Sequence, residues 1–154
     1  AILSIRKKST FEGEASTAIM FEAMKYENEL TEKSDYISLF SDISITNKNV
    51  LNTNLLVCRI AELYLEGKDK KMLAYAFHDI LASMIAGFCS VRSKFENINT
   101  VALSGGVFQN TLLLKLTKEK LNSLGLNVLT HSLIPPNDGG IALGQALYGL
   151  YHLN

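Results

Sequence analysis

Two glycine pairs, each placed just before a predicted helix, are the residues best suited to bind an anion. The first pair, Gly105-Gly106, follows Ser104 at the end of a short apolar run. Glycine has no Cβ atom to keep a ligand away from the backbone, and it tolerates positive φ. The N–H groups at the start of the next helix would point towards the same ligand. Neither the G-x-G-x-x-G nor the P-loop pattern is present, so a phosphate site and an ordinary turn both stay open.

The second pair closes the segment Pro135-Pro136-Asn137-Asp138-Gly139-Gly140. Here Asp138 stands between a stiff Pro-Pro approach and a Gly-Gly turn, at the start of the last predicted helix. A rigidly held carboxylate is what a metal–phosphate site requires. The alternative is a simple N-cap. A cap needs neither the prolines nor the glycines, so the pattern favours a metal ligand.

Both pairs belong to a predicted βαβ unit. Residues 100–103 and 127–130 are predicted strands, and helices are predicted over 110–124 and 140–151. The order strand–helix–strand makes the two strands parallel. Turns that follow parallel strands lie at the same edge of a sheet. We therefore expect the glycine turn and Asp138 to face one crevice, where they bind a nucleotide phosphate with a metal ion.

Three more helices are predicted before this unit. The first covers residues 12–25 with Thr10 as its N-cap, and the second covers 55–65 and ends at Gly67. Asp69 caps the third, which is apolar on nearly all sides and is therefore expected to be enclosed by other elements. Its expected inward residues are Leu73, Phe77, Leu81, Met84, Phe88 and Val91.

Two β-rich stretches, 36–40 and 43–46, predict a hairpin, and residues 26–35 predict a polar connection before it. In the helix over 110–124 five of the six leucines are expected to face inwards. They are Leu112, Leu113, Leu116, Leu121 and Leu124. The fold class is therefore α/β, with a mixed sheet flanked by helices.

Other polar residues carry weaker signals. Carboxylates in Glu12-Gly13-Glu14 are favoured at a helix start by the helix dipole alone. His78 lies on the most apolar helix, where a lone histidine is more often a core or partner-facing residue than a ligand. His131 and His152 lack metal-ligand spacing, and Ser104 lacks the nucleophile-elbow context.

Composition limits the class of protein. The 154 residues suit one domain, 47% of them are hydrophobic, and 15 acidic residues balance 15 basic ones. No general attraction to nucleic acid or to an anionic membrane is expected. The apolar stretch 72–91 contains polar residues, so neither a signal peptide nor a membrane span is predicted. Cys58 and Cys89 are expected to be reduced core thiols, which makes the cytoplasm the expected compartment.

With these motifs taken together, the chain resembles the end of the HypF family, the carbamoyltransferases that mature [NiFe] hydrogenases. The resemblance rests on residues 101–110 (Val-Ala-Leu-Ser-Gly-Gly-Val-Phe-Gln-Asn) and 135–146, which begin Pro-Pro-Asn-Asp-Gly-Gly. Residues 11–15 and 76–78 also look like family segments. It implies that residues 1–154, which begin with Ala1, are the C-terminal lobe of a domain in a longer multidomain protein. That domain is similar to tRNA threonylcarbamoyl-transfer proteins, in the actin/sugar-kinase/Hsp70 class.

The resemblance implies an activity that the residues alone do not. The family makes carbamoyl-adenylate from carbamoyl phosphate and ATP and transfers the carbamoyl group to the C-terminal cysteine of HypE. By motif, the nucleotide would be held by Ser104, Gly105, Gly106 and Asn110, with Glu12 and Gly13 beside it. Asp138 would be a ligand of a divalent Fe or Zn ion that a preceding lobe completes. Without that lobe, we expect this chain alone to bind metal weakly and to be inactive.

Two other functions remain open. The chain could be a non-catalytic docking module that presents the apolar helix around Phe77 and Phe88 to another domain or to HypE. An exposed apolar patch would favour that function. It could also be another ATP-binding member of the actin/sugar-kinase/Hsp70 class.

Overall fold

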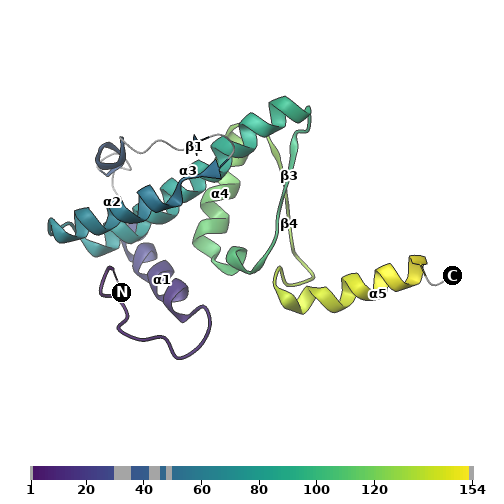
Figure 1. Cartoon of the computed structure of the whole chain (residues 1–154), viewed down its shortest axis with the longest axis horizontal. Helices are drawn as coiled ribbons and strands as arrows, with labels where there is room; N and C mark the ends of the chain where they lie inside the picture. Colours follow the sequence, from purple (N-terminus) through teal and green to yellow (C-terminus); the bar gives the residue numbers. More distant parts are fainter. Residues whose placement is uncertain (1, 30–35, 42–45, 48–49, 153–154) are drawn as a thin grey trace.

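A computed structural model describes residues 2–29, 36–41, 46–47 and 50–152 of the chain. Figure 1 shows a helical body, a two-stranded ribbon beside it, and a last helix that projects away from both. The elements in chain order are α1 (Glu14–Glu29), η1 (Ile37–Phe40), β1 (Thr46–Asn47), β2 (Val50–Leu51), α2 (Thr53–Leu65), α3 (Lys70–Glu96), β3 (Thr100–Leu103), η2 (Gly106–Gln109), α4 (Thr111–Ser123), β4 (Asn127–Thr130), η3 (Asp138–Gly140) and α5 (Ile141–His152), where η marks a 3-10 helix.

Helix α3 is the centre of the helical body. It has 27 residues, and α1, α2 and α4 all pack against it, so the prediction of an enclosed helix is confirmed. The Asp69 side chain accepts hydrogen bonds from the N–H groups of Lys71 and Met72, as predicted for an N-cap. The buried residues of α3 end at Ala86, and Val91 is 67% exposed. The prediction that Val91 faces inwards is therefore wrong, because the last turns of α3 bury no residue.

Among the described residues, α3 is the one helix long and apolar enough to cross a membrane. However, 44% of the most apolar 18-residue stretch of α3 is buried inside the protein. Contact with three other helices gives its apolar side chains the environment of a core helix.

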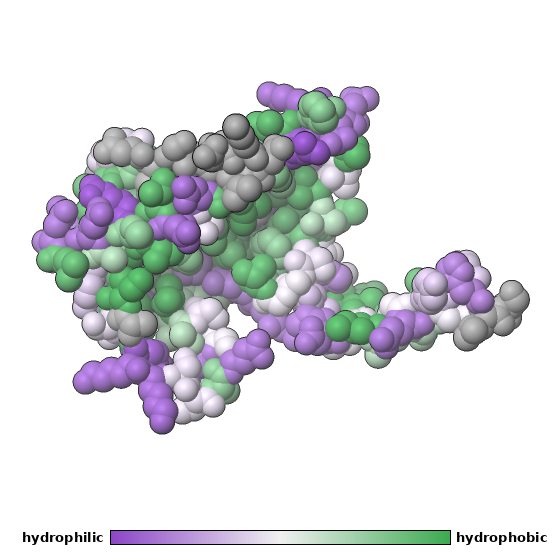
Figure 2. Space-filling model, in the orientation of Figure 1, coloured by the Kyte–Doolittle hydropathy of each residue, from purple (hydrophilic) through white to green (hydrophobic). Residues whose placement is uncertain are grey.

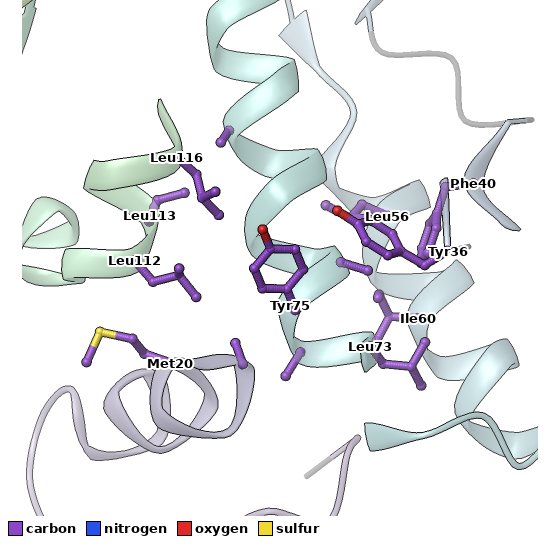
Figure 3. Packing of buried hydrophobic residues seen from close by; sticks show 14 of the residues in the cluster. Met20, Tyr36, Phe40, Leu56, Ile60, Leu73, Tyr75, Leu112, Leu113 and Leu116 are labelled. Atoms are coloured by element: carbon purple, nitrogen blue, oxygen red, sulfur yellow. The ribbon is translucent and has the colours of Figure 1, made fainter. Parts of the chain in front are cut away.

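The apolar core fills the space between α3 and the elements around it (Figure 3). Tyr75 of α3 is fully buried, with its ring centroid 5.7 Å from that of Tyr26 and 5.8 Å from that of Tyr36. The leucines of α4, at positions 112, 113 and 116, lie on the other side of Tyr75. Complete burial of an apolar side chain such as Leu56 or Leu73 contributes about 1.5–3 kcal/mol. These contacts hold α1, α2 and α4 around α3.

Strands β3 and β4 are parallel and α4 connects them, so the predicted βαβ unit is confirmed. The register pairs Thr100 with Asn127 and Leu103 with Thr130. A small second cluster, formed by Ala86, Leu103, Leu121 and Leu126, joins the ribbon to α3 and α4. Leu129 of β4 is 59% exposed, so part of the ribbon is not covered. Leu124 is 50% exposed because it follows the end of α4, and the prediction that it faces inwards is wrong.

The predicted hairpin is wrong in part. Residues Ile37–Phe40 form a 3-10 helix instead of a strand, held by bonds such as Leu39 N–H to the Tyr36 carbonyl (3.0 Å) and anchored by buried Phe40. Residues 43–45 lie outside the described part. The hairpin comes later, where β1 and β2 pair antiparallel. In the described residues the strands form two separate two-stranded sheets, not the single mixed sheet that we expected.

Helix α1 also differs from its prediction. It begins at Glu14 and continues to Glu29, not 12–25, so the predicted polar connection begins later and its residues 30–35 lie outside the described part. Thr10 is not the N-cap. Its backbone N–H and hydroxyl instead donate to the Glu14 carboxylate at 2.7 and 3.0 Å. Helix α2 ends as predicted at Gly67, which has φ +84°.

Helix α5 projects from the body (Figure 1). Every residue of α5 except Gly149 is exposed, including Leu143, Leu147 and Tyr148. Figure 2 shows apolar residues on the open surface of this helix. Soluble proteins rarely leave such a surface uncovered.

Candidate functional site

A cleft of about 450 Å³ lies where three segments distant in sequence meet. The start of α1 forms one wall, the turn that contains η2 forms the second, and the segment before η3 forms the third. The lining residues are Glu12, Gly13, Ser16, Thr17, Met20, Gly106, Val107, Gln109, Asn110, Asn137 and Asp138. The predicted geometry is thus confirmed: the glycine turn and Asp138 face one crevice.

The two glycines of the glycine turn differ in whether the backbone conformation requires glycine. Gly105 has φ +98°, a conformation that side chains rarely adopt. Gly106 has no positive φ, and a Cβ atom built on it would meet only the Asn137 Cβ, at an ordinary 3.9 Å. The described fold therefore requires glycine at position 105 but not at position 106. The same distance shows that the two turns lie in contact.

The acidic turn is capped by Asn137, not by Asp138. The Asn137 side chain accepts a hydrogen bond from the Gly139 N–H at 3.1 Å. The Asp138 carboxylate is exposed and makes no hydrogen bond or ion pair within the described part of the chain. The simple N-cap alternative for Asp138 is therefore wrong, and its carboxylate is available to a ligand.

The two residues after Asp138 must be glycines because the loop leaves little room for a side chain at either position. A Cβ atom on Gly139 would come within 3.1 Å of Pro135 Cγ, and one on Gly140 within 3.0 Å of the Pro135 carbonyl oxygen. Pro135 thus packs closely against both glycines. This tight packing fixes where the backbone presents Asp138.

The carboxylates that open α1 differ in their surroundings. Glu14 accepts bonds from Thr10 and forms an ion pair with Arg6 at 3.0 Å, and the Thr10 bonds lower the pKa of its carboxyl. Glu12 lines the cleft and has no such partner among the residues that the structure describes. Glu14 therefore shapes the helix start, whereas Glu12 faces a potential ligand beside Gly13.

Two predicted site residues, Ser104 and Gly105, are not part of the cleft lining. Gly105 directly precedes the lining residue Gly106, whereas Ser104 has another partner. It follows β3 and its hydroxyl lies 2.8 Å from His131 Nε2. His131 follows β4 at the equivalent register position, directly after the Leu103–Thr130 pair. Sequence analysis missed this pair. The signal that would reveal it is the shared position of the two residues just past neighbouring parallel strands.

His78 is buried, as expected of a core histidine, but it also contacts the cleft lining. Its Nε2 lies 2.9 Å from Nδ2 of Asn110, a residue 32 positions further along the chain. Asn110 is the N-cap of α4, and its Oδ1 accepts the Leu113 N–H at 3.0 Å. A buried polar side chain thus connects the core helix to the cleft.

The two cysteines are free thiols. Cys89 is half-buried, and burial raises the pKa of its thiol. Cys58 is exposed on α2, so the prediction of two core thiols is wrong for this residue.

The donor set of the cleft fits part of a metal site. The described residues contain no group of three His, Cys, Asp or Glu side chains that would hold a metal ion. Asp138 and Glu12 bring carboxylate oxygens to the cleft, and such oxygens bind divalent cations. Structural and catalytic Zn sites use three or four protein ligands. The remaining ligands of an Fe or Zn ion would have to come from outside the described residues.

The chain matches one family over most of its length. A family model described as a carbamoyltransferase, Kae1-like domain, second subdomain of HypF, matches residues 1–145. The chain belongs to the HypF carbamoyltransferase family. The resemblance expected from the glycine and acidic turns is confirmed.

Relatives in the HypF family are much longer than this chain. The probable carbamoyltransferase HypF of Methanocaldococcus jannaschii is 28% identical over 153 residues, which are 96% of this chain and 18% of that protein. The carbamoyltransferase HypF of Synechocystis sp. is 30% identical over 147 residues, again 18% of its length. The chain therefore spans less than a fifth of these relatives.

Solved HypF structures share the fold. A crystal structure of full-length HypF in the phosphate- and nucleotide-bound form superposes with a TM-score of 0.80 and 31% identity, over 99% of this chain and 19% of that chain. HypF of T. kodakarensis gives a TM-score of 0.74 with 27% identity, over 96% of this chain and 18% of that chain. The α/β arrangement of helices around a small parallel sheet is thus that of HypF.

Proposed function

We propose that the cleft is one half of an ATP-dependent carbamoyltransferase site, and that another part of the polypeptide supplies the other half. The substrates would be carbamoyl phosphate, water and ATP. Water releases carbamate and phosphate from carbamoyl phosphate, a carbamate oxygen attacks the α-phosphorus of ATP, and pyrophosphate leaves as carbamoyl-adenylate forms. The acceptor would be the C-terminal cysteine of HypE. The thiolate sulfur attacks the carbamoyl carbon, a C–S bond forms, and the C–O bond to AMP breaks with its electron pair. The thiol proton goes to solvent.

One observation carries this proposal: turns after two parallel strands meet the start of α1 in a single cleft. Ligands of open α/β sheets bind at the carboxyl ends of the strands. Gly106 lines the cleft and has no side chain, so a phosphate in the cleft could approach its backbone. A HypF crystallised in a phosphate- and nucleotide-bound form further supports a nucleotide as the ligand.

Each predicted residue has a role in this proposal. Gly105 gives the turn its shape, Gly106 leaves room for phosphate, and Asn110 anchors the helix that follows. Asp138 ligates a divalent Fe or Zn ion, which would neutralise phosphate charge when bound. Glu12 and Gly13 line the cleft and would lie beside the nucleotide. Ser104, which precedes the glycine turn, would contact phosphate or carbamoyl. The lobe would belong to the actin/sugar-kinase/Hsp70 class, and the free thiols suit the reducing cytoplasm.

The test is Asp138→Asn in the full-length gene product. Removing one metal-ligand charge should lower carbamoyl transfer to the HypE cysteine by 10-fold or more, by analogy with the loss of one transition-state contact. Transfer is measured with radiolabelled carbamoyl phosphate, and folding by thermal unfolding. The matched control is Glu66→Gln, which removes one negative charge from an exposed residue outside the cleft. Equal transfer by both variants would contradict the proposal.

A docking function is favoured by a different observation, the exposed apolar surface of α5. The helix around Phe77 and Phe88, which sequence analysis suggested for docking, is half-buried against its neighbours and is not that surface. Because the matching family model describes a second subdomain, the partner proposed for α5 is another part of the same polypeptide. Docking of α5 is compatible with the enzymatic role, since it would assemble the two halves of the site.

A further inference from the structure

The most buried polar contact near the cleft belongs to His78. This side chain is 1% exposed and bridges two elements. Its Nδ1 lies 2.7 Å from the Ala74 carbonyl oxygen one turn earlier in α3, and its Nε2 lies 2.9 Å from Asn110 Nδ2. No part of the proposed chemistry uses His78 directly.

The hydrogen bonds determine which ring nitrogen carries the proton. The Ala74 carbonyl can only accept, so Nδ1 must donate. The Asn110 amide is oriented by its Oδ1, which accepts the Leu113 N–H at 3.0 Å, so its Nδ2 donates to His78. Nε2 is therefore an unprotonated acceptor. His78 is neutral, with hydrogen on Nδ1.

A charged His78 would break this arrangement. An Nε2–H group would face the Asn110 N–H group, and turning the amide would place its N–H group against Leu113 N–H. Burial also lowers the pKa of His78, against a smaller opposite effect of the Ala74 bond. A proton shuttle at this position is therefore disfavoured, and a fixed acceptor is favoured.

Asn110 is the joint between the glycine turn and α4. Its N–H donates to the Val107 carbonyl at 3.2 Å, within the turn that begins at Gly106. Its own carbonyl accepts from Leu114 N–H at 3.0 Å in the first turn of α4. Any reorientation of Asn110 would shift the cleft wall that η2 forms.

We propose that His78 is a positioning residue: its Nε2 holds the Asn110 amide so that Asn110 caps α4 and fixes the glycine turn in the ligand-binding conformation. This inference rests on the proposed function only in assigning a nucleotide to the cleft. The bond between the buried helix and the cap stands independently of the ligand. His78 thus couples the centre of the core to the site.

Two substitutions separate the two bonds of His78. In His78→Gln the side-chain oxygen reaches the ε position and can still accept from Asn110. In His78→Asn the amide reaches only the δ position, so it can bond to Ala74 but not to Asn110. Both variants lose the ring, so a purely structural role predicts similar effects on the site. If His78 positions Asn110, only His78→Asn should impair the site.

The experiment uses the full-length gene product. Hydrogen exchange of the peptide covering residues 111–116 should rise about fivefold to tenfold in His78→Asn and stay near wild type in His78→Gln, as expected for loss of one buried hydrogen bond. The dissociation constant for a non-hydrolysable ATP analogue should change by a similar factor. If His78→Asn does not fold, His78→Leu replaces it, because leucine lacks both bonds and leaves no unpaired polar atom of its own.

A double-mutant cycle completes the test. Asn110→Ser keeps a cap oxygen but has no amide N–H for His78, so adding His78→Asn to it should not raise exchange further. Equal effects of His78→Asn and His78→Gln, or full additivity with Asn110→Ser, would overturn the inference. Absence of nucleotide binding by the wild-type protein would instead contradict the proposed function, whereas hydrogen exchange needs no ligand and still tests His78.

Discussion

At the residue scale, carboxylates near the start of α1 and in the acidic turn divide into two groups. Glu14 is occupied by Thr10 and Arg6, which lowers the pKa of its carboxyl. Glu12 and Asp138 both line the cleft without a partner among the described residues. Both side chains are exposed, so water solvates them and the fold itself does not use them in an ion pair. Their carboxylates are therefore free to bind the cation that we propose for this cleft.

Gly106 provides the first residue-scale prediction. Gly106→Ala should leave the free energy of unfolding within about 1 kcal/mol of wild type, because φ is not positive and the new Cβ meets only an ordinary contact. The same methyl group should weaken ATP binding at least fivefold, because it occupies the space through which phosphate reaches the backbone. Urea unfolding and calorimetric titration of the full-length protein measure the two effects.

Gly105→Ala is the control for this prediction. At φ +98° an alanine is strained, and strain of this kind costs about 1–3 kcal/mol, so this variant should lose stability as well as binding. If Gly106→Ala binds ATP as tightly as wild type, the glycine turn is not a phosphate site.

At the element scale, α1 and α3 are joined by apolar packing and by two sets of ion pairs. Glu22 of α1 is buried and lies 2.6 Å from Lys25 and 3.5 Å from Lys70 of α3. Glu29 forms a more exposed pair with Lys71, at 2.7 Å. Since Glu12 and Gly13 directly precede α1, the attachment of α1 to α3 also places one wall of the cleft.

Glu22 should make stability depend on pH. The bond from Lys25, followed by the nearby Lys70 charge, lowers the pKa of Glu22 below its ordinary value of 4.5. The unfolded chain then binds the proton more readily than the folded one, so stability rises with pH in this range. The contribution is present above pH 4.5 and is lost as pH falls through the lower folded value. Glu22→Gln should lower the free energy of unfolding by about 0.5–1 kcal/mol at pH 7. Measured by urea unfolding, the stability of this variant should also fall less steeply than that of wild type below pH 4.5.

The matched variant is Glu29→Gln, which removes the same charge from the same pair of helices at an exposed position. It should cost less than Glu22→Gln, because both side chains of its pair are solvated. A larger loss for Glu29→Gln would show that burial of Glu22 does not strengthen its ion pairs.

At the scale of the whole molecule, α5 and the exposed part of the ribbon have no covering layer among the residues that the structure describes. Helix α5 has 12 residues and buries none of them. An isolated helix of that length is marginal in water. In proteins such a helix is stabilised when its apolar side chains pack against another element. The HypF relatives are much longer than this chain, and the docking proposed above assigns the partner of α5 to that additional length.

The whole-molecule prediction compares two exposed leucines in the full-length gene product. Leu147→Asp in α5 should lower the unfolding temperature by several degrees and reduce carbamoyl transfer, because docking would bury the new carboxylate. Leu65→Asp, at the end of α2, is the control, since Leu65 is 85% exposed. Differential scanning calorimetry and the transfer assay measure both variants. If the two behave alike, α5 has no partner in the protein.

The sequence by itself determined the features that depend on near neighbours along the chain. Asp69 caps α3, Gly67 ends α2, and the parallel strands flank α4 as predicted. Caps and glycine stops act within about four residues, so their patterns are readable locally. The meeting of the two turns also followed from the sequence, because parallel βαβ topology leaves little choice of edge.

The tertiary structure decided what depends on contacts between distant residues. A β-rich stretch became the 3-10 helix Ile37–Phe40, because local bonds and the burial of Phe40 outweighed its strand preference. Asn137, not Asp138, proved to be the cap, and only the folded turn shows which side chain reaches the N–H group. The bond between His78 and Asn110 spans 32 residues. Nothing in a local pattern reveals such a bond, because its partners meet only after α3 and α4 pack together.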